Sequence, residues 1–336
     1  MPTSPNGETT LLTGATGFVG SAVARNLAAR GHRLRLLVRA GSDQRNLTGI
    51  EAELAEGDLR EPRSLAAAVA GCRYVVHVAA DYRIWVPDPG AMIAANVAGT
   101  TALMEAALAA GVERVVHCSS VAALGLDPNG GEADENTRVT AEAIVGVYKR
   151  SKYQAEQAVL RLVRERGLPA VIVNPAGPVG PRDIKPTPTG RMIADAAAGR
   201  IPAYVDTGLN IVHVDDVAEG HALALERGRI GERYILGSEN LLLRDLLSIV
   251  AEEAGRKPPR IALPVAPLWP FAIASELLAR FGVEPMVTRD HLRMARKKMF
   301  FSSAKAMREL GYAPRPARLA VRDAIAWFRA AGMVPA

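Results

Sequence analysis

The chain has 336 residues, of which 49% are hydrophobic and 23% charged, a balance typical of globular proteins. Its formal net charge is +6, but the basic residues are spread along the chain and aromatic residues make up only 5%. No nucleic-acid recognition motif is present, so we expect no nucleic-acid partner.

The cysteines and the N-terminal segment indicate the cellular setting. Cys72 and Cys118 form neither a CxxC pair nor a disulfide framework, which indicates a reducing, cytoplasmic environment. The first residues, MPTSPNGETT, lack the apolar core of a signal peptide, and residues 1–7 are expected to be a flexible tail.

The longest uncharged run, IALPVAPLWPFAIAS, covers residues 261–275. Its 15 residues include three prolines, so the run is too short and too interrupted to span a bilayer. It is expected to line an apolar pocket or to form a lid. The nearby basic segment RMARKK at 293–298 also allows a peripheral membrane contact.

Strands and helices alternate through the first half of the chain. In chain order the pattern predicts a strand at 9–14, a helix at 18–30, strands at 32–39 and 52–59, a helix at 61–71, a strand at 74–80, a helix at 90–110, a strand at 114–120, a helix at 148–166 and a strand at 169–175. Strands separated by helices of this length predict an α/β fold with a doubly wound parallel sheet.

The pattern loosens after Pro175. Residues 176–210 are rich in proline and glycine, and the segments IVHVDD (211–216) and RYILG (233–237) are expected to return to the sheet. Residues 241–330 have a mostly helical pattern. We therefore expect a sheet domain at 8–178, rejoined by 211–236, and a smaller, mostly helical lobe at 179–210 and 237–330.

The segment TGATGFVG (13–20) places three glycines between the first strand and the first helix. Gly14 permits a tight turn, Gly17 lets the backbone approach a pyrophosphate, and Gly20 allows close packing of the helix on the strand. The phosphates would meet the free N–H groups and the positive dipole end of the helix. This context predicts that the sheet domain is a Rossmann NAD(P)-binding domain and that the smaller lobe binds the substrate.

The end of the second strand, LLVRAGSDQR (36–45), bears on the choice of cofactor. An acidic residue there usually binds the ribose 2′-hydroxyl of NAD, whereas an arginine accommodates the 2′-phosphate of NADP. Arg39 occupies this position, with Ser42 and Arg45 just beyond, which favours NADP(H). Asp43 keeps NAD(H) open, as does the alternative that Arg39 only stacks on the adenine.

The segment GVYKRSKYQAEQAV (146–159) contains two tyrosines, and only one of them has a lysine four residues later. Tyr148 and Lys152 would lie one turn apart on the same helix face, whereas Tyr153 has no such partner. Taken alone, the segment is also compatible with a solvated cluster of charged side chains.

Several short motifs occur in the order found in a known enzyme family: the spaced glycines, GDL (57–59), HVAA (77–80), NVAGT (96–100), CSSVAALG (118–125), YKRSK (148–152) and NPAGPVGP (174–181). From residue 9 to 330 the chain resembles the extended short-chain dehydrogenase/reductases, that is, the NAD-dependent epimerase/dehydratase family. The segments HVAADYRIW, PVGPRDIKPTPTGR, AYVDTGLN and MARKKMFFSSAKA are similar to the hopanoid-associated sugar epimerase group. Dihydroflavonol-reductase-like proteins are more distantly similar.

This resemblance implies an enzyme that transfers hydride at a secondary alcohol or ketone carbon, with Ser120, Tyr148 and Lys152 as catalytic residues. An unperturbed tyrosine has a pKa of about 10, and a neighbouring ammonium lowers it by stabilising the phenolate. Lys152 would also hold the nicotinamide ribose, and Ser120 would donate a hydrogen bond to the substrate oxygen. Tyr153 is expected to be a packing residue.

The resemblance also implies the cofactor contacts and a homodimer. Asn96 is expected to tie neighbouring strands together, and the helices at 90–110 and 148–166 are expected to form the dimer bundle. The residues expected to contact NADP(H) are Gly14, Thr16, Gly17, Phe18, Val19, Arg39, Asp58, Leu59, Ala79, Ala80, Tyr148, Lys152, Pro175 and Val179.

One departure from the family pattern bears on the substrate. Sugar-nucleotide members carry an arginine and an asparagine where this chain has Asn174 and Gly177. The departure argues against a UDP-sugar, and the apolar run at 261–275 suggests a partly apolar substrate such as a lipid-linked polyol or ketone. Three functions stay open: NADPH-dependent carbonyl reduction, which the residues favour slightly, epimerisation with a retained cofactor, and non-catalytic cofactor sensing.

Other polar residues are expected to be structural. His77, His117 and His213 are not spaced as metal ligands and are expected to be hydrogen-bonded within the fold, so no metal site is predicted. Asp215 and Asp216 are expected to cap the helix that follows them.

Overall fold

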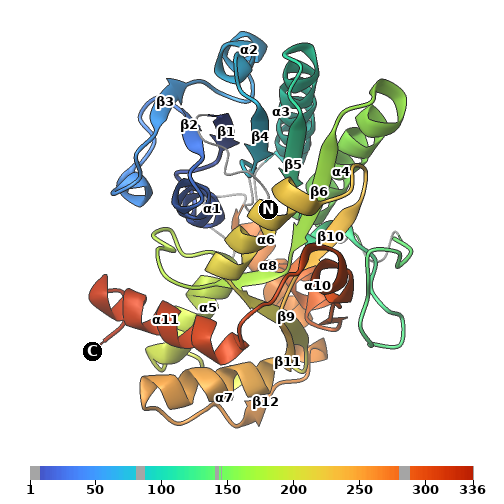
Figure 1. Ribbon diagram of the computed structural model, residues 1–336. Helices are drawn as coiled ribbons and strands as arrows, with labels where there is room; N and C mark the ends of the chain where they lie inside the picture. Colours follow the sequence, from blue (N-terminus) through green and yellow to red (C-terminus); the bar gives the residue numbers. More distant parts are fainter. Residues whose placement is uncertain (1–7, 81–87, 141–143, 145, 280–287, 336) are drawn as a thin grey trace.

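The computed structural model describes residues 8–80, 88–140, 144, 146–279 and 288–335, so the predicted tail at 1–7 lies outside the described residues. A parallel sheet with strand order β10-β6-β5-β4-β1-β2-β3 forms the centre of this part of the chain (Figure 1). Its strands are β1 (Thr9–Thr13), β2 (Arg33–Val38), β3 (Glu53–Glu56), β4 (Tyr74–His77), β5 (Arg114–Cys118), β6 (Ala170–Pro175) and β10 (Arg233–Leu236).

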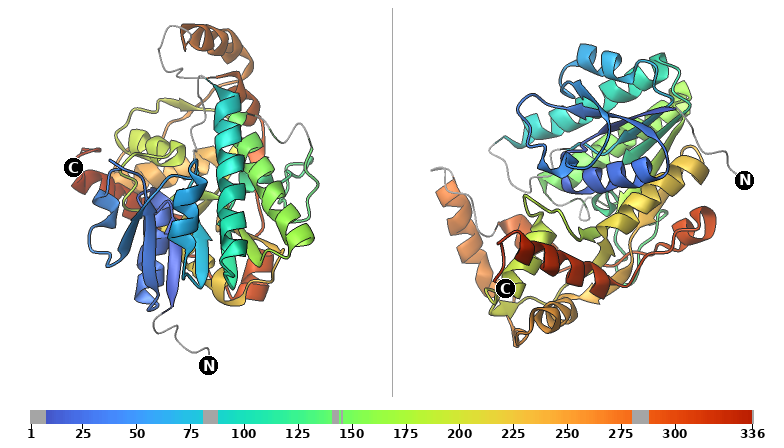
Figure 2. Two further views of the ribbon diagram at one scale, coloured as in Figure 1. Left: turned by 90° about the horizontal axis from the view of Figure 1, so that it is seen from above. Right: turned by 60° about the vertical axis from the view of Figure 1, so that its left-hand side comes forward.

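Helices cover both faces of this sheet. One face carries α1 (Phe18–Ala29) and α6 (Val214–Arg227), and the other carries α2 (Pro62–Val69), α3 (Pro89–Ala109) and α4 (Val147–Arg166) (Figures 1 and 2). Leu12 and Val76 belong to the first hydrophobic layer, and their strand neighbours Leu11 and Val75 belong to the second. The predicted doubly wound Rossmann sheet is confirmed.

A second, smaller sheet lies beyond the main one. Its order is β11-β9-β13, formed by β11 (Glu239–Leu242), β9 (Gly208–His213) and β13 (Lys298–Met299), and β7 (Gly177–Val179) also pairs with β9. The strand predicted at 211–216 was therefore placed wrongly, because β9 joins this sheet and only β10 returns to the main one. A glycine at position 177 lets the two strands approach, since a Cβ there would lie 2.9 Å from the carbonyl oxygen of Asn210.

The remaining elements form the lobe around the second sheet. Three helices, α5 (Pro188–Ala197), α7 (Leu243–Ala254) and α11 (Ala317–Ala330), share a separate hydrophobic core. The helical character predicted for 241–330 is confirmed, whereas the exact domain boundaries stay a prediction. The other elements are β8 (Ala203–Tyr204) paired with β12 (Ile261–Ala262), the helices α8 (Trp269–Ala279), α9 (Arg289–Met294) and α10 (Ala304–Leu310), and the 3-10 turns η1 (Arg45–Leu47), η2 (Val121–Ala123) and η3 (Ala266–Leu268).

Among the described helices, α3 alone is long and apolar enough, by length and composition, to cross a membrane. Its Leu103, Met104 and Ala107 are fully buried in the layer shared with α2 and α4. This burial is that of a core helix covering the sheet.

Candidate active site

The predicted site residues meet at the carboxyl edge of the main sheet. Strand β1 pairs with β2 on one side and with β4 on the other, so the order of the strands reverses there. Ligands of open α/β sheets bind outside the carboxyl ends of the strands at such a point. The glycine turn follows β1, Ala79 and Ala80 follow β4, and Ser120 follows β5.

The turn after β1 leaves no room for side chains. Gly14 has φ +78°, and a Cβ there would lie 2.6 Å from the backbone nitrogen of Ala79. The N–H of Gly17 donates to the carbonyl oxygen of Gly14 at 2.9 Å, and a Cβ on Gly20 would overlap that same oxygen. The backbone is therefore folded as the three glycines predict.

The first turn of α1 can hold an anion. Gly17 is its N-cap and supplies no side-chain cap, so the N–H groups of Phe18, Val19 and Gly20 have no acceptor within the helix. The side chains of Thr16, Phe18 and Val19 are half-buried around the turn. Free amides at the positive end of a helix suit a pyrophosphate, so these residues fit a dinucleotide cofactor.

Arg39 follows β2 directly and its side chain is exposed. Within the described part of the chain, its guanidinium makes no hydrogen bond or ion pair. The hydroxyl oxygen of Ser42 is buried and has no hydrogen-bond partner among the described residues. An unpaired guanidinium close in the chain to an unsatisfied hydroxyl suits the binding of a 2′-phosphate.

The acidic residues near this point are bound to arginines of their own. Asp43 pairs with Arg45 at 2.7 Å, and this hydrogen bond lowers the pKa of Asp43 to about 2. Asp58 pairs with Arg60 at 2.8 Å, which lowers its pKa to about 2 in the same way. Each carboxylate is therefore already bound by an arginine two residues away in the chain.

Replacing Arg39 with alanine is expected to weaken NADPH binding by about ten- to a hundredfold and NADH binding much less. The reason is that a hydrogen bond to a charged group contributes about 1.5–3 kcal/mol and only NADPH carries the 2′-phosphate. Fluorescence titration with both cofactors measures the effect. Arg45→Ala is the matched control, because Arg45 is bound to Asp43. Equal losses for both cofactors in Arg39→Ala would contradict its role as selector.

Lys152 fixes the start of α4 against the end of β5. Its Nζ donates to the carbonyl oxygen of Cys118 at 3.0 Å, and the side chain is buried. Two further N–H donors of Lys152 remain for ribose hydroxyls. Tyr148 lies one turn earlier on the same face of α4, half-buried, and its hydroxyl has no hydrogen-bond partner among the described residues. The phenol is therefore free to meet a substrate oxygen close to a lysine charge.

Ser120 lies two residues beyond Cys118, at the start of η2. Its Oγ accepts a hydrogen bond from the N–H of Ala122 at 3.1 Å, which leaves its own O–H free to donate. The contacts thus bring Ser120 and Lys152 to the same end of β5, next to the helix that carries Tyr148. The catalytic roles of these three residues stay a prediction.

A buried polar network behind the site was not predicted from the sequence. The carboxylate of fully buried Glu156 accepts from Nδ2 of Asn174 at 2.7 Å and pairs with Arg233 of β10 at 3.4 Å. Burial raises the pKa of Glu156, and the hydrogen bond from Asn174 and the charge of Arg233 oppose that shift. Because Glu156 lies four residues after Lys152, its place on the same helix face is the signal that could have pointed to it.

The structure also locates four other residues for which the sequence predicted a role. Asn96 donates to the hydroxyl of Ser151 at 2.7 Å and so ties α3 to α4, whereas its predicted role between strands stays a prediction. Val179 is only 1% exposed and belongs to the core of the second lobe, and Pro175 is also buried. Leu59, at the carboxyl side of β3, lies against α3, because a Cβ on Gly99 would meet its side chain.

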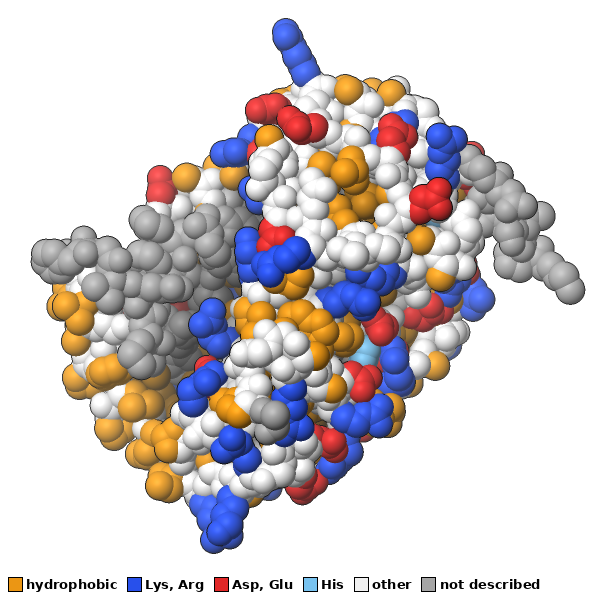
Figure 3. All heavy atoms as spheres, turned by 90° about the vertical axis from the view of Figure 1, so that its left-hand side faces the viewer, with side chains coloured by type: hydrophobic (Ala, Val, Ile, Leu, Met, Phe, Trp, Pro, Cys, Tyr) orange, Lys and Arg blue, Asp and Glu red, His pale blue; other side chains and the backbone are white. Residues whose placement is uncertain are grey.

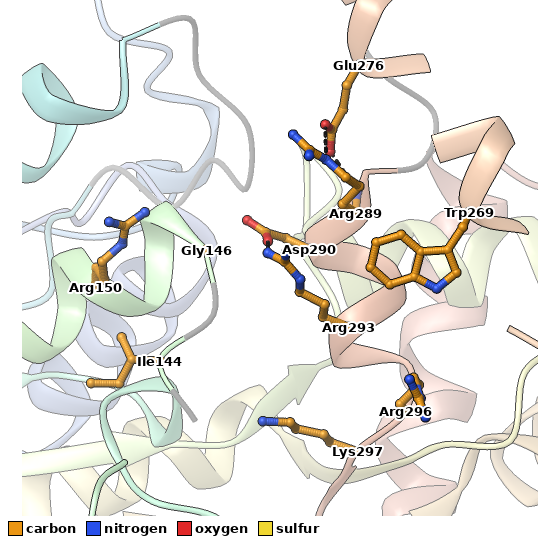
Figure 4. A pocket seen from close by; sticks show the side chains of 10 residues that line it. All are labelled: Ile144, Gly146, Arg150, Trp269, Glu276, Arg289, Asp290, Arg293, Arg296 and Lys297. Atoms are coloured by element: carbon orange, nitrogen blue, oxygen red, sulfur yellow. Dashed lines mark hydrogen bonds and ion pairs between the residues drawn. The ribbon is translucent and has the colours of Figure 1, made fainter. Parts of the chain in front are cut away.

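A cleft of about 880 Å³ opens between the start of α4 and the pair α8 and α9 (Figure 4). Arg289 pairs with Glu276 at 2.7 Å and Arg293 with Asp290 at 3.1 Å, so the cleft keeps an excess of positive charge. Tyr148 is not among the lining residues, although Gly146 and Arg150, which lie two residues before and after it in the chain, are. The lining residues are Ile144, Gly146, Arg150, Trp269, Glu276, Arg289, Asp290, Arg293, Arg296 and Lys297.

The apolar run at 261–275 does not line this cleft as predicted. Trp269 is its one residue among those that line the cleft, whereas Phe271 and Ile273 are about half exposed to solvent. The helix α8 projects from the lobe (Figure 2), and its large apolar side chains Phe271, Ile273, Leu277 and Leu278 are about half exposed.

The histidines His77, His117 and His213 differ in whether their ring nitrogens are hydrogen-bonded. Both ring nitrogens of His77 are hydrogen-bonded to threonines, and Nδ1 of His213 accepts from the N–H of Asp215 at 3.0 Å. His213 thereby caps α6, while Asp216 pairs with an arginine, so the predicted aspartate caps were wrong. His117 stacks on His77, but neither of its ring nitrogens has a partner among the described residues, which contradicts the predicted hydrogen bonding. No group of metal-binding side chains occurs within the described ranges.

The free energy of unfolding is expected to fall steeply as the pH drops below 6.5. Burial lowers the pKa of His77 to about 3 and that of His221 to about 4, and it also lowers the pKa of His117 well below the usual 6.5. At these three histidines only the unfolded chain binds protons in this window, so each costs about 1.4 kcal/mol per pH unit. Asp183, whose pKa is raised to about 6 by burial, binds a proton in the folded state and offsets part of this fall. Urea unfolding from pH 7 to pH 5 measures the slope. His117→Phe should reduce it by about a third, and an unchanged slope would contradict this account.

Comparisons with known proteins agree with this arrangement. The NAD dependent epimerase/dehydratase family matches residues 10–237. A Synechocystis sp. protein provisionally named dihydroflavonol 4-reductase is 41% identical over 96% of this chain and 95% of its own length. Sterol demethylase protein B of Methylococcus capsulatus is 38% identical over 97% of this chain and 100% of its own length. The crystal structure of gox2253 is 64% identical, with a TM-score of 0.89 over 98% of this chain and 100% of that one. The chain therefore belongs to the NAD-dependent epimerase/dehydratase family of extended short-chain dehydrogenases/reductases, which are NAD(P)-binding enzymes.

Proposed function

We propose that this enzyme uses NADPH to reduce a ketone on a partly apolar substrate. The observation that carries the proposal is the hydrogen bond from Lys152 to Cys118, which holds the lysine close to Ser120 and on the face of α4 that presents Tyr148. The unpaired guanidinium of Arg39 supports NADPH over NADH.

Several residues of the chain have distinct roles in this reaction. NADPH supplies a hydride to the carbonyl carbon when it is bound at the glycine turn. Tyr148 donates its phenolic proton to the carbonyl oxygen, and the nearby Lys152 charge stabilises the phenolate that remains. Ser120 donates a hydrogen bond to the same oxygen while negative charge builds on it. Asn174, Glu156 and Arg233 keep the end of β5 and the face of α4 in place.

Two observations support an apolar ketone rather than a sugar nucleotide. The close approach of Asn210 to Gly177 leaves no room for the asparagine that sugar-nucleotide members carry. Two similar proteins are named for a dihydroflavonol 4-reductase and for a sterol demethylase. The excess positive charge of the cleft further favours a substrate that also carries an anionic group.

Epimerisation is the second candidate, since the family includes epimerases and the segments around residues 77–85 and 294–306 resemble the hopanoid-associated sugar epimerases. An epimerase removes and returns the same hydride, so it keeps its cofactor bound through the cycle. Cofactor sensing without catalysis ranks last, because the tyrosine and the lysine are both present.

Net consumption of NADPH distinguishes these functions. The purified protein is expected to carry less than one cofactor per chain and to oxidise NADPH when sterol or other polycyclic ketones are supplied. Cofactor content after denaturation and absorbance of reduced nicotinamide measure both quantities. A full complement of bound NAD(P)⁺ with no net consumption would support the epimerase instead.

A further inference from the structure

The helix α8 and the residues before it expose an unusual concentration of large apolar side chains. Nine large hydrophobic residues are exposed in the described part of the chain, and six of them lie between positions 261 and 278. Phe271 is 51% exposed, Leu277 51% and Leu278 56%, whereas Ala272 is the one fully buried side chain between positions 269 and 278 of α8. Such a patch on a helix that projects from the fold indicates a binding surface (Figure 2).

Basic residues flank this apolar segment on both sides in the chain. Between positions 256 and 298 the described residues include eight that are basic and two that are acidic. The acidic ones, Glu276 and Asp290, are paired with Arg289 and Arg293. The exposed basic residues are Arg256, Lys257, Arg260, Arg289, Arg293, Arg296 and Lys298.

We propose that α8 and its basic flanks dock the enzyme on an anionic lipid surface. The side chains of Phe271, Ile273, Leu277 and Leu278 enter the boundary between headgroups and acyl chains, and the flanking arginines and lysines contact lipid phosphates. The space-filling view shows hydrophobic side chains gathered at the lower left edge, on the side from which α8 projects (Figure 3).

The charge distribution favours a lipid surface over a second copy of the chain. In a two-fold symmetric dimer the same patch faces itself, so each basic flank would oppose an identical basic flank. Anionic headgroups instead complement the flanks and leave the apolar side chains free to insert.

Docking through α8 also places the cleft at the lipid surface. Trp269 and Glu276 belong to α8 and line the cleft, and the basic residues of α9 form the adjoining wall (Figure 4). An amphiphilic substrate would then enter the cleft directly from the bilayer. The docking itself does not depend on which reaction the enzyme catalyses.

Vesicle flotation tests the proposal with the full-length protein. The wild type is expected to float with phosphatidylcholine vesicles containing phosphatidylglycerol at least tenfold more than with pure phosphatidylcholine, and high salt should reduce this difference. Combined Phe271→Ser and Leu277→Ser should lower binding by about tenfold or more, because their buried apolar area is lost. Ile230→Ser is the matched control, since Ile230 is 51% exposed outside this segment.

A second variant measures how much the basic side chains contribute to vesicle binding. Lys257→Gln combined with Arg260→Gln removes two exposed charges that do not line the cleft, and it should weaken anionic vesicle binding by about fivefold per charge. Thermal midpoints of all variants should match the wild type, because the altered side chains are exposed. Failure of the wild type to bind anionic vesicles, or equal binding by the Phe271 and Leu277 variant, would overturn the proposal.

Light scattering in the absence of lipid tests the alternative that a second copy of the chain binds to α8. The dimer expected through α3 and α4 predicts the same mass for the wild type and the α8 variant. A lower mass for the variant, together with no flotation of the wild type, would show that α8 is an interface between copies of the chain and would overturn the lipid proposal.

Discussion

Replacing Tyr148 with phenylalanine is expected to lower kcat by about 100- to 10,000-fold, which is the usual contribution of general acid catalysis. The variant loses only the phenolic O–H, which makes no hydrogen bond within the described fold, so its stability should not change. The affinity for NADPH should stay within a few-fold, because the glycine turn and Arg39 bind the distant part of the cofactor. Steady-state kinetics and cofactor titration measure the two effects separately.

Tyr153→Phe is the matched control for this prediction. Tyr153 is half-buried on the same helix and lacks a lysine four residues later, so its removal should leave kcat within about threefold. If Tyr148→Phe kept a near-normal kcat, the proton would have to come from another group, and the assignment of Tyr148 would be wrong.

Replacing Gly20 with alanine is expected to remove most NADPH binding and to destabilise the fold by about 3 kcal/mol or more. A Cβ at this position overlaps the carbonyl oxygen of Gly14, which is backbone and cannot rotate away. The first turn of α1 must therefore move away from β1, and the amides that face the pyrophosphate move with it. Thermal unfolding and NADPH titration measure the two consequences.

Gly90→Ala provides the comparison for Gly20→Ala. Gly90 also lies in the first turns of a helix, but the nearest atom to its Cβ position is a side-chain oxygen of Asp88 at 3.4 Å, an ordinary contact. This variant should be as stable as the wild type or slightly more stable, because alanine favours the helix. If Gly20→Ala kept the wild-type affinity for NADPH, the glycine turn and the first turn of α1 would not be the pyrophosphate site.

The elements of the main sheet could be predicted closely from the sequence because their signals are local. Strands such as β1 and β4 are short apolar runs, each followed by an α-helix, and the helix containing Tyr148 and Lys152 was predicted within one residue of its ends. The three glycines were equally informative, because only a residue without a Cβ fits the contacts around Gly14 and Gly20.

Features that depend on contacts between distant segments could not be predicted in this way. The sequence of β9 predicts a buried strand but does not indicate which sheet the strand joins, and its partner β7 is only three residues long. The pairing of Glu156 with Arg233 joins residues 77 positions apart, and His117 lacks partners only because of how the strands pack. The exposure of α8 is likewise a property of the assembled lobe, because the same apolar residues are also compatible with the lining of a pocket.

The most direct test of the proposed reduction is to follow the hydride itself. NADPH deuterated at C4 of the nicotinamide, on the face used for transfer, is supplied with the enzyme and a candidate ketone, and the product is examined by mass spectrometry while NADPH consumption is recorded. The account predicts an alcohol heavier than the unlabelled product by one deuterium, formed in step with NADPH oxidation and abolished in Tyr148→Phe. A stereoisomer of a supplied alcohol with unchanged mass, formed without net NADPH oxidation by a protein that retains NAD(P)⁺, would contradict the account and identify the enzyme as an epimerase.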